Sequence, residues 1–327
     1  MKPFSALARA GASGLLAPLF ALCSAFLSTL VLTLVATDQA AADTPLPPVA
    51  KMNVYVGCIN RLSERAFDSR KRYFSWAAPS GPTGRERIIY GTYTIYDTSD
   101  CRKGVDKANA MEPHDAALEA AATAYAEAAG RLEPLLKEAD DYYSAENYKD
   151  DGMAKGKALH PRLVAAWDAF AAADRSLRGA VEAINDRRAL AKLAEIEAKE
   201  GRKAHYYVEA LMIDAKRVLG GERAEASDPA AITQALNDYE EAIKGAEQSS
   251  GAAGDLKIGS LFISSAKAYL VTGKQLMRRI RDRVPYSSGE RMMLGNPGSG
   301  WMVEGSPPRL LRDYNQLVDA YNRGPGI

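Results

Sequence analysis

Cysteine and histidine are both scarce in this chain, with three of each among 327 residues. No His-Glu-x-x-His motif is present, and His114 and His205 each stand alone in the sequence. Protein metal centres of the zinc type draw several imidazole or thiolate ligands from short, regular spacings. The sequence therefore predicts no metal site and no bound cofactor.

An excess of charge of one sign is also missing, because 42 lysines and arginines stand against 41 aspartates and glutamates. Removal of residues 1–42 takes away Lys2, Arg9 and Asp38 and leaves the two signs in equal number. A protein that neutralises nucleic-acid phosphates needs a basic surplus. No nucleic-acid partner is therefore expected.

Long hydrophobic runs are absent except at the start, where an apolar stretch from about 14 to 36 follows Lys2 and Arg9. It ends in Gln39-Ala40-Ala41-Ala42, an A-x-A site, so we expect a secretory signal peptide cleaved after Ala42. The run also reaches the roughly 20 residues that span a bilayer, and an uncleaved inner-membrane anchor is the alternative. After cleavage, residues 43–327 should be periplasmic or secreted, with no stable membrane insertion.

Two cysteines remain in that mature chain, Cys58 and Cys101. In an oxidising compartment an isolated pair favours a disulfide, which would close the N-terminal part of the domain. Two buried structural thiols are the alternative. A catalytic thiol is disfavoured, because no histidine lies near either cysteine in the sequence.

Apolar residues recur with helical spacing between Asp115 and Tyr143, on two tracks of period seven. That is the a/d pattern of a long helix packed against a partner. The track residues are Leu118, Tyr125, Leu132 and Ala139, and then Ala122, Ala129, Leu136 and Tyr143. Pro134 interrupts the segment and predicts a kink or a break.

A second apolar track begins at Leu163 and continues to Val218, where Gly220-Gly221 predicts a stop. An unbroken helix from Pro161 to Leu219 would be about 90 Å long. Gly201 is its weakest point, because glycine costs about 1 kcal/mol inside a helix.

Capping residues and apolar spacing indicate the remaining helices. They are expected at Val49–Trp76, Asp228–Ser249, Asp255–Val284 and after Ser306-Pro307-Pro308, with a loop at 286–305. Only Ile88–Tyr96 is β-branched and aromatic enough to predict a short strand. The expected fold is mainly α, an elongated up-and-down helical bundle in one domain over 43–327, with long coiled-coil-like helices and at most one short β segment.

The richest side-chain chemistry lies between 140 and 161, where three tyrosines, four aspartates, three lysines and a histidine occur together. The block around Tyr142–His160 resembles the signature of the YiiG family, exported helical bacterial proteins whose function is not established. Weaker points of resemblance are Lys51–Asn60, Gly305-Ser306, Tyr314-Asn315 and Tyr321-Asn322. The resemblance implies a helical envelope protein and supplies no catalytic residue. Many relatives look like lipoproteins, whereas Leu22 before Cys23 does not suit a lipidation site.

Two functions remain open for this block. Asp150, Asp151 and His160 carry groups that bind a divalent metal or perform acid–base chemistry, which would make the protein an enzyme. The other hypothesis, which we favour, is a structural junction and recognition surface with no catalytic residue. Pro161 disfavours helical geometry at His160, so the chain would turn there between two long antiparallel helices. Asp151 and Lys155 would form an i,i+4 pair.

On the second hypothesis the block binds an unidentified envelope protein or a ligand. The binding residues would be Tyr142, Tyr143, Tyr148, Asp150, Asp151, Lys155 and His160. An enzyme of another kind has no support, because no glycine-rich loop follows a strand and no G-x-S-x-G motif is present.

Overall fold

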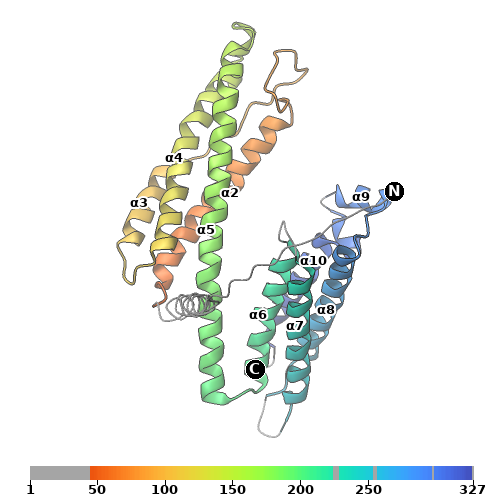
Figure 1. Ribbon diagram of the computed structural model, residues 1–327. Coiled ribbons are helices and arrows are strands. Elements are labelled where there is room, and N and C mark those ends of the chain that lie inside the picture. Colours follow the sequence, from red (N-terminus) through yellow and green to blue (C-terminus); the bar gives the residue numbers. More distant parts are fainter. Residues whose placement is uncertain (1–44, 224–227, 253–255, 297, 326–327) are drawn as a thin grey trace, which may run out of the picture. The chain divides into compact units, whose positions relative to one another are not determined.

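The computed structural model describes residues 45–223, 228–252, 256–296 and 298–325. The predicted signal peptide, with its cleavage site after Ala42, lies outside the described residues. Pro47–Ile327 forms one compact unit, which contains all the described helices (Figure 1). The helices are α2 (Val49–Phe74), α3 (Thr98–Asn109), α4 (Ala116–Ser144), α5 (Ala154–Glu200), α6 (Ala204–Arg223), α7 (Pro229–Ser249), α8 (Ser260–Arg281), α9 (Ser288–Leu294) and α10 (Pro307–Asn322), with short 3-10 turns η1 (Asn147–Lys149) and η2 (Gly300–Met302).

The mainly α prediction is confirmed. Within the described ranges the only β pairing is an isolated bridge between Ala78 and Gly81. No helix in these ranges is both long and apolar enough to cross a bilayer.

Helices α2, α3, α4 and α5 form the N-terminal region, in which α4 and α5 pack along each other. All eight residues of the two apolar tracks predicted on α4 are buried, and the helix continues through Pro134 without a break. The coiled-coil character of this packing stays a prediction.

A buried polar network joins three helices of this region. The Ser63 hydroxyl of α2 donates to the Asp174 carboxylate of α5 over 2.6 Å and lies 2.8 Å from the Tyr125 hydroxyl of α4. Arg178 donates to the second Asp174 oxygen over 2.9 Å. A carboxylate inside an apolar interface costs free energy unless it is paired, so this network favours one register of the three helices.

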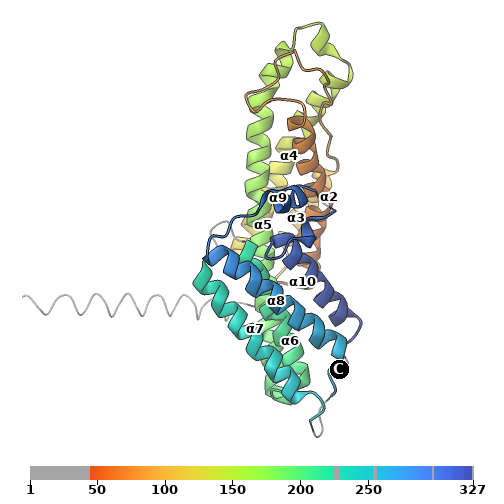
Figure 2. The same cartoon turned by 90° about the vertical axis from the view of Figure 1, so that its right-hand side faces the viewer.

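Helices α6, α7, α8 and α10 form the core of the C-terminal region (Figure 2). The core is mainly aliphatic. It also contains two buried tyrosines, Tyr239 and Tyr269, whose ring centroids lie 5.6 Å apart. Tyr239 donates to the Ala266 carbonyl over 3.2 Å and Tyr269 donates to the Ala215 carbonyl over 2.9 Å, so both hydroxyls are satisfied.

The predicted weak point at Gly201 is a real helix end. Gly201 has a positive φ of 77°, and α5 ends at Glu200 before α6 begins at Ala204. The stop predicted at Gly220-Gly221 is wrong, because α6 includes both glycines and ends at Arg223. Asp228 and Ser306 cap α7 and α10 through their side chains, as expected. The predicted start of the next helix, Asp255, lies outside the described residues, and α8 begins at Ser260.

The loop predicted at 286–305 contains α9 and η2. Helix α9 could have been predicted from the sequence, because Ser287 and Glu290 have the spacing of a capping box. In this box each side chain accepts a hydrogen bond from the other residue's backbone N–H. Helix α3 was also missed. Its short buried face consists of Thr98, Cys101, Val105 and Ala108.

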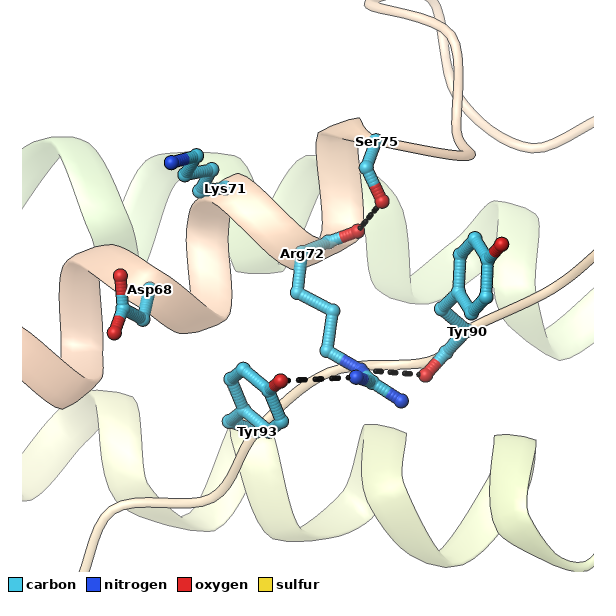
Figure 3. Close-up of a pocket in the computed structure, with 6 residues that line it drawn as sticks. All are labelled: Asp68, Lys71, Arg72, Ser75, Tyr90 and Tyr93. Atoms are coloured by element: carbon cyan, nitrogen blue, oxygen red, sulfur yellow. Dashed lines mark hydrogen bonds between the residues drawn. The ribbon is translucent and has the colours of Figure 1, made fainter. Parts of the chain in front are cut away.

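The strand predicted at Ile88–Tyr96 is wrong. The segment has no partner strand within the described ranges. It lies along α2 instead, and side chains of that helix donate hydrogen bonds to its carbonyl groups (Figure 3). Ser69 donates to the Tyr93 carbonyl over 2.6 Å, and Arg72 donates to the Tyr90 carbonyl over 2.8 Å. Its β-forming composition therefore yields a strand-like conformation held by a helix, because no second strand is adjacent.

The predicted disulfide is present between Cys58 of α2 and Cys101 of α3. Both residues are buried, with 1% and 0% of their surface exposed. The bond ties the two helices together across a separation of 43 residues, including the whole extended segment.

Candidate functional site

The residues of the central block meet where α4 turns into α5. The turn lies at Ala145–Met153, earlier than predicted, and Pro161 sits inside α5. Glu146, Gly152 and Met153 have φ values of 55°, 59° and 70°, so the reversal is made by left-handed backbone positions. The prediction of a turn at Pro161 is wrong, because Pro161 lies inside α5 and the chain reverses upstream of it, at Gly152 and Met153.

Asp151 holds the start of α5. Its carboxylate accepts from the Lys155 backbone N–H over 3.0 Å and from the Tyr142 hydroxyl over 2.8 Å. The backbone bond from Lys155 is the largest of the effects that lower the pKa of Asp151. The first N–H groups of a helix have no intrahelical partner, so this carboxylate satisfies one of them.

The expected i,i+4 pair between Asp151 and Lys155 is wrong, because the contact is made by the backbone of Lys155. The Lys155 ammonium instead pairs with Glu138, at 3.4 Å. Lys149 pairs with Glu146. Asp150 is exposed; its backbone N–H donates to the Asn147 carbonyl over 3.1 Å, whereas its carboxylate makes no hydrogen bond or ion pair with any described residue.

His160 uses both ring nitrogens to hold its neighbours. Nε2 lies 3.2 Å from the Pro79 carbonyl, which can only accept, so Nε2 carries a proton. Nδ1 lies 3.0 Å from the Tyr73 hydroxyl, which donates to it in the neutral tautomer. Gly81, with φ of 106°, lets the loop close over the imidazole, because a Cβ there would stand 3.1 Å from the ring.

An aromatic cluster surrounds these groups, and sequence reasoning missed half of it. Tyr143 packs edge-on against Trp76 at 5.1 Å and against Tyr142 at 5.0 Å. Tyr73 lies 5.4 Å from Trp167 and stacks on His160 at 5.8 Å.

Burial raises the pKa of Tyr73 to about 12. Tyr148 lies at the edge of the cluster, 6.4 Å from Tyr143. Tyr73 was detectable in the sequence, because it shares the buried face of α2 with Ala66 and Ser69.

The cluster also holds the extended segment in place. The Trp76 indole donates to the Gly91 carbonyl over 2.9 Å. Gly91 has φ of 67°, and a Cβ there would lie 3.2 Å from Tyr143. The backbone between Tyr90 and Tyr93 is therefore fixed from both sides, by the cluster and by α2.

Two buried polar atoms of the cluster have no partner in hydrogen-bond geometry among the described residues, the Tyr143 hydroxyl and the Trp167 indole nitrogen; the polar neighbour of the Tyr143 hydroxyl is the Tyr73 hydroxyl. Burial raises the pKa of Tyr143, which keeps its hydroxyl protonated. No group of three or more His, Cys, Asp or Glu side chains lies in a metal-binding arrangement within the described ranges.

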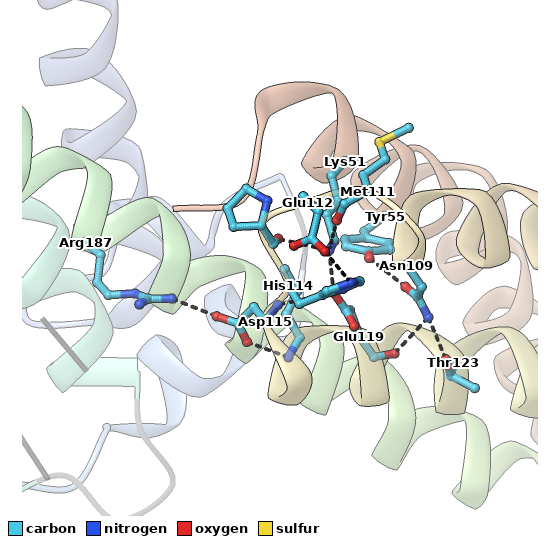
Figure 4. A network of polar contacts seen from close by, with 12 residues as sticks. Lys51, Tyr55, Asn109, Met111, Glu112, His114, Asp115, Glu119, Thr123 and Arg187 are labelled. Carbon is cyan, nitrogen blue, oxygen red and sulfur yellow. Dashed lines mark hydrogen bonds and ion pairs between the residues drawn. The ribbon is translucent and has the colours of Figure 1, made fainter. Parts of the chain in front are cut away.

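A second polar cluster lies around the start of α2, about 33 Å along that helix from Tyr73 (Figure 4). The Lys51 ammonium is completely buried, pairs with Glu119, and donates to the Met111 and Pro113 carbonyls over 2.9 and 3.3 Å. Burial acts to raise the pKa of Glu119, but hydrogen bonds from Lys51 and His114 outweigh it and lower the pKa.

The sequence suggested that His114 stands alone, but in the structure its ring contacts two glutamates. Its Nδ1 lies 2.9 Å from Glu119 and its Nε2 lies 3.1 Å from Glu112, and the contact with Glu119 is the main cause that raises its pKa. Asp115, next to it, pairs with Arg187 of α5 at 2.8 Å. Lys51 could have been flagged, because it lies four residues before buried Tyr55 on the same helix face.

Comparison with known proteins assigns the chain to a family. The model of a family described as "Protein of unknown function (DUF3829)" matches residues 47–323. The chain is also 39% identical over 300 residues to the uncharacterized protein YiiG of Escherichia coli (strain K12), an alignment that covers 88% of this chain and 84% of that protein. No solved structure matches. The chain therefore belongs to this YiiG-containing family of proteins of unknown function.

Proposed function

We propose that the protein is exported and acts outside the cytoplasm as a helical protein that binds a ligand or partner without catalysing a reaction. The observation that carries the first part is the buried disulfide between Cys58 and Cys101. Structural disulfides persist in oxidising compartments such as the periplasm and are rare in the cytosol. The bond agrees with the signal peptide predicted at 1–42.

The second part rests on how the residues of the central block are used. Both oxygens of Asp151 and both nitrogens of His160 are engaged in holding the α4–α5 turn and the Pro79 loop. A general base needs a free acceptor within reach of a substrate. The arrangement favours a structural role for these two residues and leaves Asp150 as the one of the three whose side chain makes no hydrogen bond or ion pair with a described residue.

Export can be tested by counting thiols, because each possible form of the protein has a different number. The full chain is expressed in Escherichia coli, and the denatured protein is treated with a heavy maleimide before and after reduction. A processed, oxidised protein shows no reactive thiol before reduction and two after. An uncleaved, oxidised protein retains Cys23 and shows one and three.

The control is a variant that lacks residues 2–42, which should stay in the cytoplasm and show two reactive thiols without reduction. N-terminal sequencing of the periplasmic form should begin at Asp43. Two reactive thiols in unreduced protein from the periplasm, or recovery of the full chain only in the cytosol, would contradict the proposal.

The enzyme hypothesis for Asp150, Asp151 and His160 has its own test. Substitutions Asp150→Asn and His160→Gln are compared for thermal stability and for binding of divalent metal ions. We expect His160→Gln to lower the melting temperature, because it loses a contact with Tyr73 or with Pro79, and Asp150→Asn to change nothing. Loss of metal binding with an unchanged melting temperature would favour the enzyme.

A further inference from the structure

An open groove lies between the second half of α2 and the extended segment, with a volume of about 400 Å³ (Figure 3). This volume is within the range of sites for small molecules. Its lining residues are Asp68, Lys71, Arg72, Ser75, Tyr90 and Tyr93. The central block contributes indirectly, since Trp76 and Tyr143 fix the segment that carries the two tyrosines.

The Arg72 guanidinium is held in place within this groove. Its Nε donates to the Tyr90 carbonyl over 2.8 Å, and its Nη1 donates to the Tyr93 hydroxyl over 3.0 Å. Its Nη2 makes no hydrogen bond, and the side chain makes no ion pair, with any described residue. An arginine whose rotamer is already fixed loses little further entropy when it binds an anion.

The balance of charge in the groove is positive. Lys71 lines the groove, is exposed and makes no ion pair with the described part of the chain; its ammonium points away from the Arg72 guanidinium and reaches the groove by a change of rotamer (Figure 3). Asp68 is the only carboxylate that lines the groove, and it too makes no ion pair there. Two uncompensated cations against one carboxylate favour a ligand with a negatively charged group.

The two tyrosines provide the rest of the recognition surface. Tyr93 accepts from Arg72, so its own proton is free to be donated, and the Arg65 guanidinium packs over its ring at 4.0 Å. Tyr90 is 49% exposed, with the Arg72 guanidinium 5.8 Å from its ring centroid, and the exposed part of the ring can contact a flat or hydroxylated body. Asp68 can accept a hydrogen bond from a hydroxyl of such a body.

We propose that this groove binds a small organic anion, with its carboxylate or phosphate at Arg72 and Lys71 and its hydroxyl-bearing body between Tyr90 and Asp68. The inference rests on the proposed non-catalytic binding function and names its ligand class. An acidic sugar is the simplest molecule with this combination of groups.

Three probes separate the requirements of the site. Purified residues 43–327, with the disulfide intact, are titrated at low salt with glucuronate, glucose 6-phosphate and uncharged glucose by ligand-observed NMR. We expect saturable binding of at least one of the two anions, weakened by added salt, and none of glucose. The preferred anion identifies the charged group as a carboxylate or a phosphate.

Variants then assign the binding to the groove. Lys71→Ala removes an ammonium with no described contact, so folding should be unchanged while affinity falls about fivefold. Arg72→Gln should weaken binding about tenfold or more, but it also releases the extended segment. Lys137→Ala is the matched control, because it removes an exposed lysine of α4 that makes no ion pair with the described residues.

No saturable binding of either anion below about 10 mM would overturn the proposal. So would equal binding of glucose, or an affinity that Lys71→Ala leaves at the wild-type value. Each of these results leaves the thiol count and the cellular location untouched, so failure of this inference is distinguishable from failure of the proposed export.

Discussion

The N-terminal region (α2–α5) and the C-terminal region (α6–α10) are stabilised in different ways. The N-terminal region contains a disulfide, a buried lysine, and a turn in which aromatic rings and polar groups hold one another. The C-terminal region has an aliphatic core in which Asp313 is a buried charge, satisfied by Thr272 at 2.5 Å and Arg309 at 3.0 Å.

The difference follows from the segments that each region must hold. Residues 75–97 connect α2 to α3 through a turn and then the segment Ile88–Tyr96, which has no strand partner in the described chain, so the backbone of this connection needs side chains as hydrogen-bond partners. The C-terminal helices mostly pack on one another, and burial of their apolar faces supplies most of their stability. The N-terminal region should therefore be the more sensitive to single polar or covalent changes.

The largest expected effect comes from the disulfide. The double substitution Cys58→Ala and Cys101→Ala should lower the free energy of unfolding by about 4 kcal/mol, because the bond closes a long loop in the unfolded chain. Hydrogen exchange followed by mass spectrometry should show faster exchange in α2, α3 and the extended segment, with α7 and α8 nearly unchanged. Equal acceleration in both regions would mean that they unfold as one cooperative unit.

Tyr143 should have the next largest effect. Tyr143→Ala removes a buried ring from the aromatic cluster and should cost about 3 kcal/mol in urea unfolding. Tyr143→Phe should cost almost nothing, because the buried hydroxyl has no partner in hydrogen-bond geometry among the described residues. Tyr239→Phe is the counterpart in the other region and should cost about 1 kcal/mol, because it loses the bond to Ala266. Equal costs for the two phenylalanine variants would contradict this account.

A smaller effect is expected at the buried lysine. Lys51→Met keeps most of the side-chain volume but removes the buried ammonium that pairs with Glu119 and donates to two carbonyls, at a cost of about 2 kcal/mol. The control is Lys199→Met, which breaks an exposed pair with Glu195 and should change the stability far less, because solvent screens exposed pairs. Thermal unfolding of the two variants beside the wild type measures the difference. A stabilised Lys51→Met would show that desolvation of the ion pair outweighs its attraction.

The smallest effect concerns acid stability in the C-terminal region. Hydrogen bonds from Ser287 and Arg279 lower the pKa of Glu290 from 4.5 to about 2. Between these values the unfolded chain binds a proton that the folded chain does not, so the contribution is complete above pH 4.5 and is lost as the pH falls toward 2. Glu290→Gln should flatten the loss of stability between pH 5 and pH 3 relative to wild type, measured by urea unfolding at each pH. An unchanged slope would mean that the capping box is not formed in solution.

Much of the fold could be predicted where a local pattern suffices. The a/d tracks from Leu118 to Tyr143 predicted the buried face of α4, and Asp228 and Ser306 predicted two helix starts. The weak point at Gly201 was found because glycine costs about 1 kcal/mol inside a helix, and the residue has the positive φ that glycine adopts readily. These are properties of a few neighbouring residues, and distant parts of the chain do not alter them.

The candidate site was only partly predictable. The block Tyr142–Pro161 was recognised as a junction, but its partners Tyr73, at the end of α2, and Trp76, just after that helix, lie about 70 residues earlier in the chain. The block's charges suggested chemistry, whereas Asp151 and His160 serve to hold the turn and the Pro79 loop. Which neighbour a side chain meets depends on the packing of helices, and local spacing does not contain that information.

By itself, the sequence determined the helical composition of the described chain, since periodicity and capping are local. It also predicted the disulfide between Cys58 and Cys101, the two cysteines that remain after the expected removal of residues 1–42. Only the tertiary structure decided the conformation of Ile88–Tyr96. Its composition favours a strand, but a strand needs a hydrogen-bonding neighbour. Helix α2 lies beside the segment instead. Hydrogen bonds from side chains of that helix hold the segment in place, and the segment lines one side of a groove.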